Sequence, residues 1–148
     1  MFEAELYFNT MLRQLETCAT YMEVVGDGVR VEGSWDIWQV ITWRAKISCA
    51  NGITLEAFEF HEKINGNHCR KIKYHLMDVN QKCIFRVDTH GETIPLESAC
   101  HVHVGCDEVR IDDGDERLGT VSLRGLGFPE IFGWVHASLD GKRLPWDQ

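Results

Sequence analysis

The side chains best suited to chemistry lie in the second half of the chain, in the stretch SACHVHVG at residues 98–105. His101 and His103 are two positions apart, and residues at that spacing on a β-strand point to the same face. Two imidazoles on one face can transfer protons near neutral pH or converge on one metal ion. Cys100 is adjacent to His101, so on a strand its thiol points away and the two form no nucleophilic dyad.

A second set of polar side chains follows the alternation of the segment HCRKIKYHLMD, where Lys71, Lys73 and His75 fall on one face. Arg86 and Asp88 share a face of the next segment, KCIFRVD. Together with Arg44 and Lys46 of the segment at 37–49, these residues predict a local basic surface on an acidic protein. That surface could hold phosphate groups while an imidazole acts as acid or base. The alternative is the ordinary solvent side of an amphipathic sheet.

A metal site is a further alternative. His101, His103 and Glu108 have the spacing H-x-H-x-x-x-x-E, which resembles the first metal-binding motif of cupins. Under this hypothesis the three residues are metal ligands of a small-molecule enzyme.

Tryptophans suggest another class of function. Trp35, Trp38 and Trp43 are close in sequence, and large aromatic residues often anchor protein–protein interfaces. The chain could then be a non-enzymatic protein-binding module, although tryptophans in such a pattern more often pack in the core.

The elements that must position these residues can be predicted from periodicity. Apolar residues near helical spacing predict an amphipathic helix over 3–22, and a glycine-rich segment at 24–34 predicts turns around a short strand. Alternating patterns separated by the turn signals ANG, NGN and NQ predict four long strands, at 37–49, 53–64, 68–78 and 82–88. Further along we expect a short strand at 101–104, an acidic solvated loop at 107–116, and a helix at 127–141. The prediction is a single α+β domain over 1–148, an antiparallel β-meander of about four to five strands with an N-terminal and a C-terminal helix.

Composition narrows the class of protein. A chain of 148 residues with 44% hydrophobic residues can form one globular core. No apolar run approaches the ~18 residues of a membrane span, and acids stand where a secretion signal would carry Lys or Arg, so we expect a cytoplasmic protein without membrane partners. The net charge of −8 disfavours broad attraction to nucleic acid. The six cysteines lack C-x-x-C pairs, which favours reduced thiols, and without a phosphate-binding loop motif we predict no cofactor.

The run at 74–105 resembles the TumE family, the toxins of certain bacterial toxin–antitoxin pairs. That family has a Y-H-Y-x-D strand, an x-F-R-Y-D strand and a P-H-H-K-H element before a glycine. The matching residues here are Tyr74, His75 and Asp78, then Phe85, Arg86 and Asp88, then Cys100, His101, His103 and Gly105. The likeness covers roughly 37–105. It departs from the family where THGET replaces a double histidine and leaves only His90.

The resemblance implies a toxin that an adjacent antitoxin neutralises, commonly a helix-turn-helix DNA-binding protein. Analogy with small α+β toxins suggests a metal-independent endoribonuclease with RNA as its substrate. The residues predicted to be catalytic are His75, Arg86, Asp88, His101 and His103, and those predicted to bind substrate are Lys71, Lys73, Tyr74 and Arg44.

Overall fold

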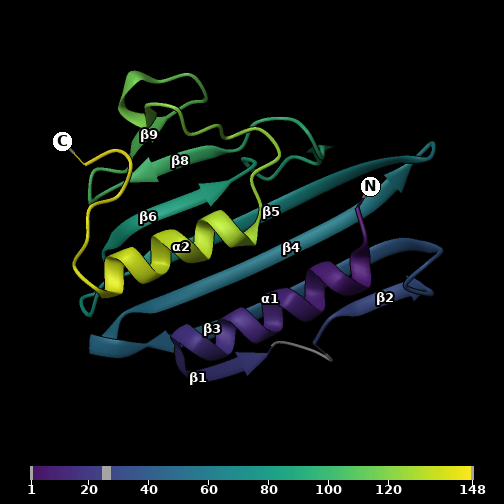
Figure 1. Ribbon diagram of the computed structural model, residues 1–148, viewed down its shortest axis with the longest axis horizontal. Helices are drawn as coiled ribbons and strands as arrows, with labels where there is room; N and C mark the ends of the chain where they lie inside the picture. Colours follow the sequence, from purple (N-terminus) through teal and green to yellow (C-terminus); the bar gives the residue numbers. More distant parts are fainter. Residues whose placement is uncertain (1, 25–27, 148) are drawn as a thin grey trace.

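The computed structural model describes residues 2–24 and 28–147 and has an α+β architecture, with two α-helices on one antiparallel sheet (Figure 1). Within these residues the sheet contains nine strands, more than the four to five expected from the sequence. They are β1 (Ala19–Val24), β2 (Arg30–Gly33), β3 (Trp38–Cys49), β4 (Thr54–Ile64), β5 (Asn67–Met77), β6 (Cys83–Asp88), β7 (Ile94–Pro95), β8 (His101–Val104) and β9 (Val109–Ile111).

The four predicted long strands are confirmed as β3 to β6, and tight turns set their register. The strand order is β1-β3-β4-β5-β6-β8-β9, with β2 also on the edge of β3 and β7 on the edge of β5. Between β4 and β5, Asn65 and Gly66 both have positive φ, 52° and 79°. Ile64 pairs with Asn67 across them, which is the geometry of a two-residue type I′ hairpin.

Both helices lie over the same face of the sheet, as Figure 1 shows. Helix α1 (Ala4–Cys18) and helix α2 (Phe128–Leu139) bury apolar stripes against it, and Pro129 starts α2 as expected. The largest side chains buried there include Phe8, Met11, Leu15, Trp43, Tyr74, Phe85 and Phe132.

The opposite side of the sheet, here called the open face, carries the polar half of each alternating strand. Its side chains include Arg44, Lys46, Phe58, Phe60, Lys71, Lys73, His75, Arg86, Asp88 and His103. The predicted alternation of the strands therefore separates a covered apolar face from a polar one.

Several predicted boundaries are wrong. The N-terminal helix ends at Cys18, and residues 19–24 pair with β3 as strand β1. Two apolar residues within the predicted helix and the first predicted long strand, Leu6 and Ile37, are 59% and 80% exposed. The acidic loop at 107–116 contains the short strand β9.

The short strand expected between glycines is β2, whereas Gly26 lies outside the described residues. No helix in the described part of the chain is long and apolar enough to cross a membrane.

Candidate active site

Arg86 is at the centre of the candidate site, because it has a histidine opposite it on each neighbouring strand. On β6 it pairs in register with His75 of β5 on one side and with His103 of β8 on the other. The two histidines are thus two strand spacings apart, about 10 Å between Cα atoms. The sequence predicted that His75 and Arg86 share one surface, and the sheet register adds His103 to the same row.

Both flanking imidazoles have an unused ring nitrogen. The Nε2 atoms of His75 and His103 are buried from solvent and have no hydrogen-bond partner among the described residues. An unpaired buried polar atom costs free energy, so such atoms usually have a partner in the functional state. These two nitrogens are free to bind a substrate proton or a ligand.

Two carboxylates hold the Arg86 guanidinium between the imidazoles. Its Nε donates to Asp88 Oδ2 at 2.8 Å, and its Nη1 donates to Glu108 Oε1 at 2.5 Å. The two bonds fix the planar guanidinium in orientation, as charge-assisted pairs do. Asp88 Oδ1 is 3.8 Å from His103 Nε2, too far for a hydrogen bond, so it acts on that imidazole through its charge.

The surroundings favour neutral imidazoles at this site. Burial lowers the pKa of His75, and the positive charges of Arg86 and Lys73 lower it further. Burial and Arg86 likewise lower the pKa of His103, although the nearby Asp88 carboxylate opposes the shift. Neutral imidazole can accept a proton, and carboxylates that favour the protonated form lie near both rings: Asp88 beside His103, and Glu56 and Glu108 beside His75.

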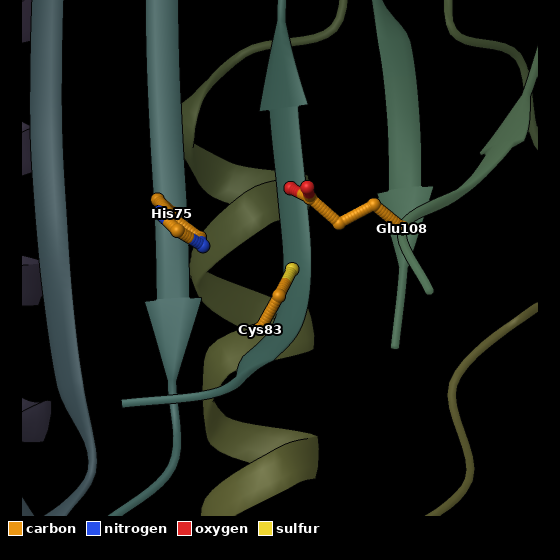
Figure 2. A group of neighbouring side chains, drawn as sticks. All are labelled: His75, Cys83 and Glu108. Carbon is orange, nitrogen blue, oxygen red and sulfur yellow. The ribbon is translucent and has the colours of Figure 1, made fainter. Parts of the chain in front are cut away.

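Two groups of side chains at this site have the donor atoms of a metal site. One consists of His75, Cys83 and Glu108, whose ligand atoms lie within 4.8 Å of one another; Figure 2 shows them converging over β6. The other is Asp88, His90 and His103, again with ligand atoms within 4.8 Å.

The open face next to the site combines cations with aromatic rings. The guanidinium of Arg44 lies over the Phe58 ring at 4.8 Å, and the Lys71 ammonium lies 5.9 Å from the Phe60 ring centre. Two hollows, of about 540 and 360 Å³, share Arg44, Phe58 and Lys73 in their walls. The larger one extends to Arg86 and Asp88, so the basic aromatic surface is continuous with the site.

The structure places most of the predicted residues on this surface, but not Tyr74. Lys71, Lys73 and Arg44 lie on the open face, whereas the Tyr74 side chain is fully buried on the covered face. Its position next to His75 in sequence explains this, because neighbours on a strand point to opposite faces. A substrate-binding role for Tyr74 is therefore wrong.

His101 lies at the edge of the site. Its Nδ1 shares a hydrogen bond with Asp112 at 2.9 Å, and its ring packs against His90 with centroids 4.3 Å apart. The cupin-like ligand set also fails, because Glu108 comes together with His75 and Cys83, and His103 with Asp88 and His90, rather than with each other and His101. Glu108 bonds to Arg86, while His103 lies beside Asp88.

The tryptophans give little support to a docking surface. Trp43 and Trp38 are 0% and 4% exposed, and only Trp35 is half-buried. Two of the three therefore pack in the core.

A buried polar network on the covered face was not expected from the sequence. Glu59 Oε1 accepts a hydrogen bond from Tyr7 at 2.7 Å and lies 2.8 Å from His61 Nε2, while its Oε2 accepts one from Tyr74. Burial alone would raise the pKa of Glu59, but the bonds from His61 and the tyrosines outweigh it and lower that pKa. The network continues through a 2.7 Å contact between His61 Nδ1 and His68 Nε2.

Acid is expected to weaken the fold through His68. Burial, followed by the neighbouring His61, lowers the pKa of His68 from about 6.5 to about 4, so the unfolded chain binds its proton more readily. The stability from neutral His68 is therefore complete above about pH 6.5 and is lost as the pH falls towards 4. Because His68 is only partly buried, we expect the free energy of unfolding to fall by only about 1 kcal/mol between pH 7 and pH 5.

Urea unfolding at the two pH values measures this loss. A His68→Gln variant should lose less stability over the same interval, since it has no imidazole to protonate. An equal loss in the variant and the wild type would contradict the assignment to His68.

Comparisons of the chain with protein-family models, curated proteins and solved structures find no match.

Proposed function

We propose that the chain binds single-stranded RNA on its open face and cleaves it at the row His75–Arg86–His103. The observation that carries this proposal is the position of one fixed guanidinium between two imidazoles whose Nε2 atoms have no partner among the described residues. A cation flanked by two proton-transfer groups suits reactions in which a phosphate gains negative charge.

The reaction proceeds by transfer of the phosphate to the RNA's own 2′-hydroxyl. Neutral His75 accepts the 2′-OH proton, and the 2′-oxygen attacks the adjacent phosphorus. His103 in its protonated form, which Asp88 favours while burial and Arg86 oppose it, donates a proton to the leaving 5′-oxygen as the P–O5′ bond breaks. Arg86 stabilises the charge on the non-bridging oxygens. The products are a 2′,3′-cyclic phosphate and a free 5′-hydroxyl, and the protein's two histidines exchange protonation states.

The remaining open face supplies the binding surface. Bases of a single strand can stack on half-buried aromatic rings such as Phe58 and Phe60, while cations hold the phosphates. The cations on this face include Arg44, Lys46, Lys71, Lys73 and Arg86, and carboxylates such as Glu56 and Asp88 lie among them. Their gathering on one face offsets locally the net charge of −8.

The biological setting follows from the resemblance of 74–105 to the TumE family. We propose a cytoplasmic toxin that a helix-turn-helix antitoxin neutralises. A single histidine, His90, stands where the family has two, and it lies near Asp88, with Nε2 3.9 Å from Oδ1. The proposed cleavage by the row His75–Arg86–His103 does not involve the position of the missing histidine.

The test is incubation of the purified protein with end-labelled single-stranded RNA, with and without a metal chelator. Cleavage that yields cyclic phosphate and persists in chelator supports the proposal. If RNA stays intact over a range of sequences, or if cleavage requires an added metal ion, the proposed reaction is wrong.

Lys73 tests the binding surface separately from the chemistry. Its side chain is exposed between Phe58 of β4 and Asp88 of β6, so Lys73→Ala removes one phosphate contact. We expect weaker RNA binding and a salt dependence reduced by about one ion. Lys142→Ala, which removes an exposed cation beyond the end of α2, is the matched control and should bind normally. Equal salt slopes for the two variants would contradict this surface.

A further inference from the structure

Three side chains with metal-ligand atoms, one of them a thiol, lie next to the row His75–Arg86–His103. We infer that His75 Nε2, Cys83 Sγ and a Glu108 carboxylate oxygen bind one zinc ion on the open face. The three ligand atoms lie within 4.8 Å of one another and come from β5, β6 and the turn between β8 and β9 (Figure 2). In a tetrahedral zinc site the ligand atoms are roughly 3.3–3.8 Å apart, so these three side chains need only move slightly closer together to bind the ion.

Cys83 faces the site only because the strand is irregular. Strict alternation would put it on the covered face with Phe85. However, Leu76 pairs with Phe85 and the next residue, Met77, pairs with Cys83, which leaves Ile84 as an extra residue in β6. A β-bulge of this kind re-aims side chains and occurs often beside functional sites. Ile84 packs against the core, and Figure 2 shows the Cys83 thiol directed towards His75 and Glu108.

Glu108 is held over β6 by an unusual backbone conformation. Its φ is 47°, in the left-handed region that costs energy for a residue with a Cβ, and its N–H donates to the Gly105 carbonyl oxygen at 3.0 Å. One carboxylate oxygen accepts from Arg86, which leaves the other available to a metal ion. In Figure 2 the carboxylate reaches across β6 towards the His75 ring.

The third ligand, His75, has the donor atom that the geometry requires. Its Nε2 is buried and has no partner among the described residues, so it can bind a metal without losing a hydrogen bond. A thiolate, an imidazole and a carboxylate suit Zn²⁺ and exclude the hard ions Mg²⁺ and Ca²⁺. Burial followed by Glu108 raises the pKa of the Cys83 thiol to about 11, so binding of the ion releases that proton to solvent.

The experiment measures zinc binding to the reduced full chain by competition with a chromophoric chelator, with no RNA present. Absorption of the Co²⁺-loaded protein reports a thiolate ligand. We expect one ion per chain in the wild type. Cys83→Ser and His75→Ala should each weaken zinc binding more than about 100-fold. Loss of a residue that only hydrogen-bonds to a metal ligand already lowers metal affinity about 10- to 100-fold, and these two residues are ligands themselves.

Two control variants keep the three ligands. Cys106→Ser removes an exposed thiol two residues from Glu108, and His90→Ala removes a member of the Asp88–His90–His103 group. Both should bind zinc like the wild type and keep the thiolate absorption. The inference is overturned if the wild type binds no ion, or if Cys83→Ser binds as well as the wild type. It is also overturned if His90→Ala or Cys106→Ser abolishes binding.

Bound zinc would occupy His75, so it should inhibit the proposed cleavage reaction. This consequence rests on the proposed function, but zinc binding itself is measured without RNA, so either idea can fail alone.

Discussion

Replacing His103 with alanine is expected to slow RNA cleavage about 100- to 10,000-fold, the range for loss of a general acid or base. The reason is its place beside Arg86, with an unpaired buried Nε2 and the Asp88 carboxylate 3.8 Å away. His75→Ala should cause a loss of similar size, because the other proton transfer depends on it. The rate is measured under single-turnover conditions, which separate chemistry from binding.

Comparison with His101 sharpens this test. His101 is also a histidine of β8, but it bonds to Asp112 at the edge of the site, so His101→Ala should slow cleavage less than about tenfold. His103→Gln keeps side-chain volume and should be as slow as His103→Ala. A larger loss in the His101 variant than in the His103 variant would move the site away from the Arg86 row.

Replacing Glu59 with alanine is expected to cost about 3–5 kcal/mol of stability, the range for removing one partner of a buried charged network. The substitution would leave the Tyr7 and Tyr74 hydroxyls and His61 without their shared acceptor inside the core. The free energy of unfolding is obtained from urea titration.

Glu56→Ala on the same strand is the matched control, since Glu56 is exposed on the open face. Its loss should stay within about 0.5 kcal/mol. Glu59→Gln, which retains an acceptor oxygen, should fall between the two. Similar stabilities for Glu59→Ala and Glu56→Ala would show that the network does not stabilise the fold.

Much of the sheet could be predicted because tight turns fix register. The turn signal NQ marks where β5 gives way to β6, but Met77 pairs with Cys83, and the extra residue Ile84 is needed to bring His75 opposite Arg86. The turn at Asn65–Gly66, by contrast, fixes the pairing of β4 with β5. Alternation then separates Lys73 from Tyr74 on opposite faces.

The parts that could not be predicted depend on broken regularity. The extra residue Ile84 brings Cys83 to the open face. No pattern in the segment KCIFRVD predicts this bulge. The sequence likewise gives no sign of the left-handed backbone conformation of Glu108, which lies in a segment expected to be an acidic loop. Glu59 lies buried in an alternating strand where an apolar residue is typical, and its partner Tyr7 is 52 residues away. Such contacts are formed by tertiary packing, which local periodicity does not encode.

The central claim is that the imidazoles on either side of Arg86 cleave RNA through its 2′-hydroxyl. The most direct measurement uses a DNA strand with a single ribonucleotide, incubated in chelator with the wild type or with a His75→Ala/His103→Ala double variant. The account predicts that the wild type cuts only after the ribonucleotide, leaving a cyclic phosphate, and that the double variant leaves the strand intact. Cutting of an all-DNA strand, equal cutting by the double variant, or no cutting by the wild type would contradict it.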